Sequence, residues 1–144
     1  MCIGSEKVSG DMLGPLVGTI LKEEYLLDAY IYGTTTRSVN GLNISKYIRL
    51  INNIHKNSLI ISIDAAVGRQ EEIGTIKLKY EGINAGAALG MNNRINGIGI
   101  VGVVAEKKGE VLSNLLEANY CMVERMGRKI ASIIYKSINQ VEIQ

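Results

Sequence analysis

The stretch LIISIDAAVG, residues 59–68, is an apolar run in which Asp64 is the single charged residue. A strand that is covered on both faces of a parallel sheet has no polar face, so this run predicts a buried strand that stops at Asp64. A second run of the same kind, IGIVGVVA at residues 98–105, predicts another buried strand. Such runs alternate along the chain with segments of helical spacing, and this alternation indicates the α/β class.

Three segments have the apolar spacing of helices. Apolar residues recur at helical spacing from about residue 11, with Pro15 in the expected first turn, and again over residues 44–54. Residues 111–138 predict one long helix whose apolar surface is broader than a single stripe. Some side chains of this helix lie off its main stripe and predict self-association into a homo-oligomer: Tyr120, Tyr135 and Ile138.

The remaining segments predict shorter elements. Residues 1–3 predict an unusually short first strand, unless the natural chain begins further upstream. AYIYG at residues 29–33 predicts a second strand, and the period-two alternation of TIKLKY at residues 75–80 is typical of a half-exposed strand at a sheet edge. Residues 81–99 are rich in Gly and Asn and predict a long irregular loop, a kind of segment that is often functional. We expect one domain over residues 1–144.

Length and composition exclude several classes of protein. A chain of 144 residues is long enough for one sizeable core, and 47% hydrophobic with 21% charged residues is a globular composition. The net charge of +2 is too small to indicate a nucleic-acid or membrane-surface partner. Cys2 and Cys121 form neither a disulfide framework nor a metal-ligand spacing, and both are predicted to lie in the core. The absence of a signal-peptide pattern or a membrane-spanning stretch predicts a cytoplasmic protein.

Two aspartates that follow predicted strands are the candidate catalytic residues. Asp11 lies in the loop after the first strand, and Asp64 ends the predicted strand LIISI at residues 59–63. The carboxyl ends of parallel strands meet at one edge of an open α/β sheet, so the two carboxyl groups are expected to face each other there. Close carboxylates repel, so one keeps its proton while the other is ionised. Such a pair can activate a water molecule and protonate a leaving group.

Each aspartate also has a structural interpretation. Asp11 is at a position where Asp often caps a helix, and Asp64 can be an anchor in the core that is satisfied by backbone N–H groups. A metal site is a further alternative, in which Glu71 or Glu72 joins the two aspartates around a cation. The lone His55 is predicted to be a solvated surface residue and is not the candidate base.

The segment CIGSEKVSGDMLGPLVG, residues 2–18, resembles the signature CIGTDRSTGD-LGPLVG of the YyaC-like sporulation proteins. IDAAVG and GINAGAALG, at residues 63–68 and 82–90, resemble the next two sequence blocks of that family. The chain departs from the family in having SEKV in place of TDRS, and Ala66 where relatives often have Cys. The resemblance covers nearly the whole chain.

This family is similar in turn to the germination protease of spores and, more distantly, to the hydrogenase maturation endopeptidases. The resemblance implies a three-layer α/β/α sandwich with a mostly parallel sheet, of the phosphorylase/hydrolase-like type. Carried over position by position, the two catalytic aspartates of germination protease fall on Asp11, in GDMLGP, and on Asp64, in IDAAVG. The His that completes the nickel site of the maturation endopeptidases has no counterpart after His55, so no metal and no cofactor are expected.

The resemblance implies a sporulation-associated peptidase that hydrolyses peptide bonds in a protein or peptide substrate, in the cytoplasm of the forespore or mother cell. Glycines near the site would let backbone amides approach a bound carbonyl group. Four glycines are predicted to bind substrate in this way: Gly10, Gly68, Gly86 and Gly90. The alternative is a non-catalytic binding or regulatory protein of sporulation on the same fold. No nucleic-acid or membrane partner is expected.

Overall fold

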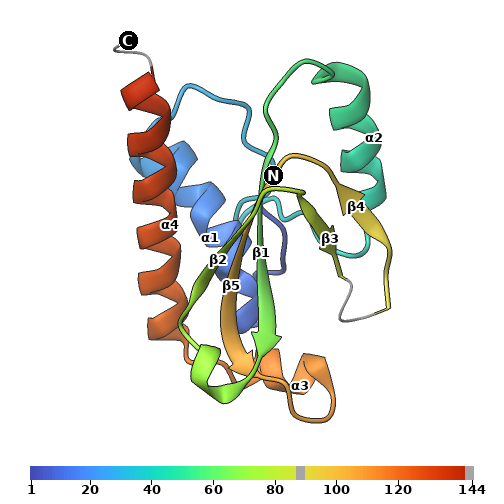
Figure 1. Ribbon diagram of the computed structural model, residues 1–144, viewed down its shortest axis with the longest axis vertical. Helices are drawn as coiled ribbons and strands as arrows, with labels where there is room; N and C mark the ends of the chain where they lie inside the picture. The colour runs from blue at the N-terminus through green and yellow to red at the C-terminus, as the bar shows by residue number, and fades with distance from the viewer. Residues whose placement is uncertain (87–89, 142–144) are drawn as a thin grey trace.

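The computed structural model describes residues 1–86 and 90–141, and a three-stranded sheet lies at its centre (Figure 1). The strands have the order β1 (Ile61–Gly68), β5 (Ile98–Glu106) and β2 (Ile76–Lys79). β1 and β5 are parallel, whereas β2 is antiparallel to β5 and lies at the edge. The α/β class and the edge position of β2 are confirmed. The sheet is mixed, because the edge strand runs against the other two.

The N-terminal residues extend the sheet on the far side of β1. Cys2 and Ile3 form single parallel bridges, with Ile63 of β1 and with Val39 respectively. The Ile3 N–H donates to the Ile63 carbonyl at 2.8 Å. Residues 1–3 therefore contribute isolated bridges in place of a regular strand. Residues 29–33 do not form the predicted strand, because they meet the N-terminal segment through one backbone hydrogen bond, in which the Cys2 N–H donates at 2.7 Å.

Two helices cover one face of the sheet. The 3-10 turn η1 (Gly10–Met12) leads into α1 (Leu13–Thr19), which has Pro15 in its first turn as predicted and continues into the π-helical turn η2 (Ile20–Glu24). α1 packs against both β1 and the long helix α4 (Tyr120–Val141), which runs along the left side of the molecule in Figure 1. These elements together bury the larger apolar surface of the sheet.

One helix and a hairpin cover the other face. α2 (Ile44–Ile54) has the predicted bounds, and it packs against the hairpin of β3 (Ile83–Ala85) and β4 (Asn93–Ile95) (Figure 1). The hairpin replaces the irregular loop that was predicted here, because its apolar side chains alternate with polar ones and are buried against α2. Residues 87–89 of the predicted loop lie outside the described residues.

Two hydrophobic clusters lie on opposite faces of the sheet, and successive side chains alternate between them. Cys2 and Ile63 belong to the cluster formed with α1 and α4, whereas Ile3 belongs to the cluster formed with α2 and the hairpin. Asp64 follows Ile63, so its carboxyl group points to the α2 face. The prediction that this strand ends at Asp64 is wrong. The strand continues to Gly68, because residues 65–68 keep pairing with β5.

Two glycines of the segment GDMLGPLVG allow α1 to approach its neighbours closely. A Cβ atom on Gly14 would overlap the Ile3 carbonyl oxygen, and one on Gly18 would overlap the carbonyl oxygen of Gly33. Backbone atoms cannot yield in the way that the end of a flexible side chain can, so a larger residue would push the helix away from the sheet. The glycine spacing of this segment therefore sets where η1, with Asp11, enters the fold.

The C-terminal segment forms two helices in place of the single helix that its periodicity predicts. α3 (Val111–Leu116) follows β5, and α4 begins after a break at residues 117–119. The Asn119 side chain caps α4, because its oxygen accepts the Met122 N–H at 3.0 Å. The carboxyl ends of β1 and β5 point toward α3 (Figure 1).

Several side chains of α4 differ from their predicted positions. Tyr135 and Ile138, expected at a self-association surface, pack against the cluster of α1 and α4, while Tyr120 is 43% exposed. Cys121 is exposed and not in the core, whereas Cys2 is buried as predicted. Among the residues that the structure describes, no helix combines the length and the apolar composition needed to cross a membrane.

Candidate active site

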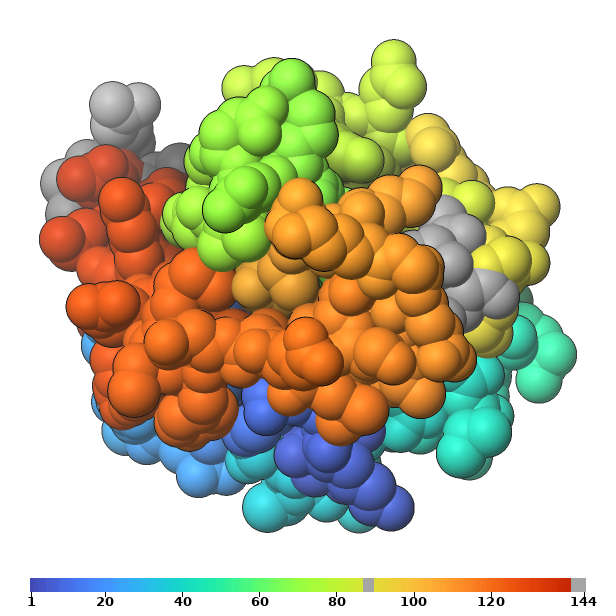
Figure 2. Space-filling model, turned by 90° about the horizontal axis from the view of Figure 1, so that it is seen from below, coloured from blue at the N-terminus to red at the C-terminus, as the bar shows by residue number. Residues whose placement is uncertain are grey.

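A cavity of about 270 Å³ lies on the α2 face of the sheet and contacts the carboxyl-end half of β1. Its walls come from the N-terminal segment, η1, β1, α2, the hairpin and α3. Figure 2 shows the molecule from below, where α3 and the segment before it, in light orange, cover this end between the 3-10 turn η3 (Gln70–Glu72), in green, and the N-terminal loop in dark blue. Both candidate aspartates line this cavity.

Asp11 reaches the cavity from η1, where the chain turns from the N-terminal segment into α1. The Ser5 N–H donates to the Asp11 carbonyl at 3.2 Å. Gly4 lies so close that a Cβ atom on it would overlap the same carbonyl oxygen, and its φ of +145° is a conformation that favours glycine. Asp11 is half-buried, and no side chain caps η1 or α1, so the interpretation of Asp11 as a helix cap is wrong.

Asp64 lies in the middle of β1, opposite Val101 of β5 in the strand register. The side chain is half-buried, and its Oδ1 atom accepts the Ala65 N–H at 3.0 Å. A β-bulge interrupts the pairing with β5 between Ala66 and Val67, and both of these residues line the cavity. Bulges near functional sites change the direction of side chains and end regular pairing. β1 is therefore irregular directly beyond the candidate catalytic residue.

Burial raises the pKa values of both carboxyl groups, and the charge of Asp11 raises that of Asp64 further. Burial raises the pKa of Asp11 from 3.8 to about 6, and a hydrogen bond from the Ser5 backbone offsets part of this effect. Burial, followed by the charge of Asp11, raises the pKa of Asp64 from 3.8 to about 8, while the bond from Ala65 lowers it. Both groups line the same cavity, where the charge of Asp11 opposes the ionisation of Asp64. Near neutral pH, Asp11 is therefore ionised and Asp64 carries a proton.

The four glycines predicted to bind substrate take different positions. Gly86 lines the cavity next to β3 and has a φ of +72°. Gly10 packs against α3, where an added Cβ atom would lie 2.8 Å from the Leu115 carbonyl oxygen. Gly68 lies at the end of β1, beyond the cavity, and Gly90 is exposed with open space around it. Of the four, Gly86 lines the cavity that holds the aspartates.

Several polar residues of the cavity did not stand out in the sequence: Lys79, Asn40, Asn84 and Asn93. Lys79 ends β2, is exposed, and brings a positive charge to the edge of the cavity. The side-chain oxygen of Asn84 accepts the Asn93 N–H at 2.8 Å, so the NH₂ group of Asn84 can donate to a ligand. The high number of Asn residues in this segment could have indicated these cavity residues, because Asn is depleted in strands and is therefore unusual in a hairpin.

The structure separates the two glutamates of the metal-site alternative from the aspartates. Glu71 and Glu72 belong to η3 (Gln70–Glu72) and pair with basic side chains instead, at 3.1 Å from Arg69 and 2.7 Å from Lys77 respectively. The hydrogen bond with Lys77 lowers the pKa of Glu72 to about 2. Within residues 1–86 and 90–141, no three His, Cys, Asp or Glu side chains are grouped as ligands of a metal ion.

Fold and cavity together define an α/β domain in which two carboxyl groups line one cavity. Residues 1–133 match the family described as "Protein of unknown function (DUF1256)", and the chain belongs to this family. The chain is also 36% identical over 89 residues to the "Uncharacterized protein YyaC" of Bacillus subtilis (strain 168), which confirms the YyaC-like resemblance. That alignment covers 62% of this chain and 43% of the relative, less than half of the relative's length. No solved structure gives a significant match.

Proposed function

We propose that this protein is a sporulation-associated peptidase that hydrolyses peptide bonds with Asp11 and Asp64 as an acid–base pair. One observation carries the proposal: the two carboxyl groups line one cavity and have pKa values of about 6 and about 8, on either side of neutral pH. Environments that push the pKa values of two neighbouring groups apart supply a base and an acid together. The resemblance to germination protease supports the peptide bond as the group that is cleaved.

In the proposed reaction, ionised Asp11 is the general base. It takes a proton from a water molecule, and the water oxygen forms a bond to the carbonyl carbon of the peptide. Protonated Asp64 is the general acid and donates its proton to the leaving nitrogen as the C–N bond breaks. The products are a carboxylic acid and an amine, and a proton then passes from Asp11 to Asp64. Lys79 and Asn84 are the candidate donors to the carbonyl oxygen as it gains negative charge.

The proposal includes the finer features that the resemblance implies. The fold is a variant of the three-layer α/β/α sandwich with a mostly parallel sheet, a relation that the two hydrophobic clusters on opposite faces support. The substrate is a protein or peptide, and the place of action is the cytoplasm of the forespore or mother cell. The active form is a homo-oligomer, which solution scattering at high protein concentration tests directly.

The experiment for the activity is incubation with a basic, unstructured polypeptide, followed by mass spectrometry of newly formed termini. We expect the native chain to cleave it and Asp11→Asn or Asp64→Asn to lose at least about 100-fold in rate, because general acid–base groups contribute roughly 10²–10⁴-fold. Asp28→Asn is the matched control, since Asp28 is the remaining aspartate of the chain and is exposed. Full activity in either Asp11→Asn or Asp64→Asn would overturn the mechanism.

A non-catalytic binding or regulatory protein of sporulation is the second candidate, and one observation favours it. Much of the cavity wall is aliphatic, with Ile3, Ile44 and Ile83 among its residues, and such walls suit the binding of an apolar peptide segment. The same incubation separates the two functions. Saturable binding of the polypeptide without any new terminus would support binding in place of hydrolysis.

A further inference from the structure

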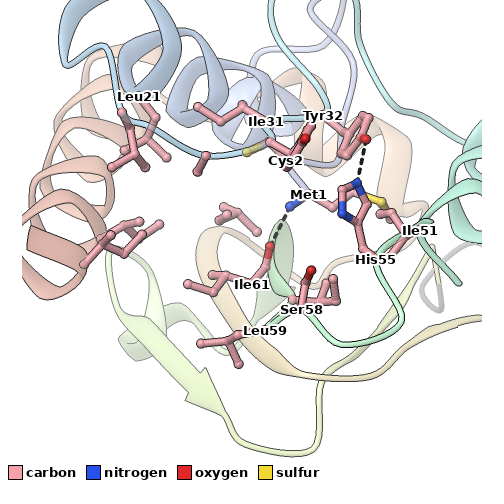
Figure 3. A pocket seen from close by; sticks show the side chains of 17 residues that line it. Met1, Cys2, Leu21, Ile31, Tyr32, Ile51, His55, Ser58, Leu59 and Ile61 are labelled. Atoms are coloured by element: carbon pink, nitrogen blue, oxygen red, sulfur yellow. Dashed lines mark hydrogen bonds between the residues drawn. The ribbon is translucent and has the colours of Figure 1, made fainter. Parts of the chain in front are cut away.

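A second cavity, of about 260 Å³, lies at the amino end of β1 and shares none of its described lining residues with the aspartate cavity. Figure 3 shows it between residues 27–32, the segment of residues 55–60 before β1, and α4. Most of its wall is aliphatic and includes Leu21, Ile31, Ile61, Ile134 and Ile138. A concave apolar wall with a few polar groups is the usual composition of a small-molecule site.

Polar side chains gather at one side of this second cavity (Figure 3). The Tyr32 hydroxyl oxygen and the His55 Nε2 atom are 2.8 Å apart, and the rings of Tyr30 and His55 have centroids 4.7 Å apart. The sequence predicted that His55 is a solvated surface residue, but its side chain is half-buried here. The Ser58 N–H donates to the His55 carbonyl at 3.1 Å, which holds Ser58 on the same side.

The bond between Tyr32 and His55 leaves one donor available, whichever group donates. If the tyrosine hydroxyl donates to Nε2, the Nδ1 atom of the neutral imidazole carries its proton and can donate to a ligand. If the Nε2–H group donates to the hydroxyl oxygen, the hydroxyl hydrogen is available instead. A ligand with a hydrogen-bond acceptor at one end matches this pair. A carboxylate is the strongest such acceptor, because hydrogen bonds to an ionised group are stronger than neutral ones.

We propose that this second cavity binds a monocarboxylate with an unbranched aliphatic chain. The cavity volume of about 260 Å³ holds a chain of about eight to ten carbon atoms, at about 30 Å³ for each group of water-like size. The chain lies along the aliphatic wall, and the carboxylate accepts a hydrogen bond from whichever of Tyr32 and His55 keeps its donor free. Two large side chains at the rim remain uncovered without a ligand, since Tyr30 is 79% exposed and Leu59 is 69% exposed. An aliphatic chain in the cavity covers part of this apolar surface.

Isothermal titration calorimetry of the native chain with octanoate, butanoate and octan-1-ol tests the proposal. We expect octanoate to bind at one site and butanoate, which lacks four methylene groups, to bind about 200-fold more weakly. Octan-1-ol, which lacks the carboxylate, is expected to bind about 10-fold more weakly than octanoate. Equal binding of octanoate and butanoate, or no binding of octanoate, would overturn the proposal.

The double variant Tyr32→Phe with His55→Phe isolates the head group. It keeps an apolar ring at both positions but removes the donors of Tyr32 and His55, so octanoate is expected to lose its preference over octan-1-ol. Tyr47→Phe is the matched control, because the Tyr47 ring lies 5.9 Å from that of Tyr32 but does not line the cavity. This control keeps the preference for the carboxylate. A double variant that also keeps the preference would contradict the assigned role of Tyr32 and His55.

Isoleucine methyl NMR locates the ligand independently of any variant. Ile61 and Ile134 line the second cavity, whereas Ile44 and Ile83 line the aspartate cavity. We expect octanoate to shift the methyl signals of the first pair and to leave the second pair unchanged. Shifts confined to Ile44 and Ile83 would move the ligand to the other cavity and overturn the proposal. Neither readout involves peptide cleavage, so the result does not depend on the proposed peptidase function.

Discussion

Replacing Asp64 by Asn is expected to change how the stability of the fold depends on pH. The pKa of Asp64 in the folded chain is about 8, above its ordinary value of 3.8, so between these values the folded chain holds a proton that the unfolded chain has released. The stability contributed by the protonated carboxyl group is complete below the lower value and is lost as the pH rises toward the higher one. Asp11 acts in the same direction up to about pH 6.

The size of this effect follows from the linkage between protonation and folding. Each pH unit over which the folded state holds one extra proton lowers the free energy of unfolding by about 1.36 kcal/mol, so Asp64 accounts for at most about 4 kcal/mol between about pH 5 and about pH 8. Water reaches the half-buried carboxyl group and screens part of the cost, so we expect about 2–3 kcal/mol. Asn retains the oxygen that accepts the Ala65 N–H but does not ionise, so Asp64→Asn removes this loss.

Urea unfolding followed by far-ultraviolet circular dichroism, repeated across this pH range, measures the difference. The control is Asp28→Asn, which removes an exposed carboxyl group of the same kind. The native chain and the control are expected to lose stability as the pH rises, while Asp64→Asn loses about 2–3 kcal/mol less between about pH 5 and about pH 8. An unchanged slope in Asp64→Asn would refute the argument, because the carboxyl group would then be no harder to ionise in the folded chain than in the unfolded one.

Three further predictions concern the chemistry and the packing. The kcat/KM of the proposed peptidase is expected to rise through about pH 6 and to fall through about pH 8, because Asp11 must be ionised and Asp64 protonated. A kcat/KM that keeps rising above about pH 8 would contradict these roles. Gly14→Ala lowers the free energy of unfolding by about 1–3 kcal/mol in urea, because the added Cβ atom overlaps the Ile3 carbonyl oxygen; a gain in stability would show that α1 can move away at no cost. Asn119→Ala lowers stability by about 1 kcal/mol in thermal unfolding through loss of the α4 cap, and Asn119→Asp, which keeps the cap, retains it.

Local patterns were sufficient where a segment's environment follows from its own residues. The apolar runs of β1 and β5 and the helical spacing of α2 predicted these elements, because a strand covered on both faces and a one-sided helix have distinct patterns. The failures occurred where packing or a single cap outweighed the pattern. The apolar spacing continues across Asn119, yet its side chain starts a new helix there. The hairpin at β3 and β4 forms in a Gly- and Asn-rich segment because its apolar residues find a partner in α2.

The sequence by itself determined that the chain is of the α/β class and that Asp64 is an unusual carboxylate within an apolar run, with Asp11 as its candidate partner. Only the tertiary structure decided that they line one cavity, that Gly86 joins them there, and that their pKa values are raised. The same holds for the pairing of Tyr32 with His55 in the second cavity. The physical reason is that burial and proximity depend on strand register and on the face to which a side chain points. Both are set by contacts between residues far apart in the chain, which no local pattern records.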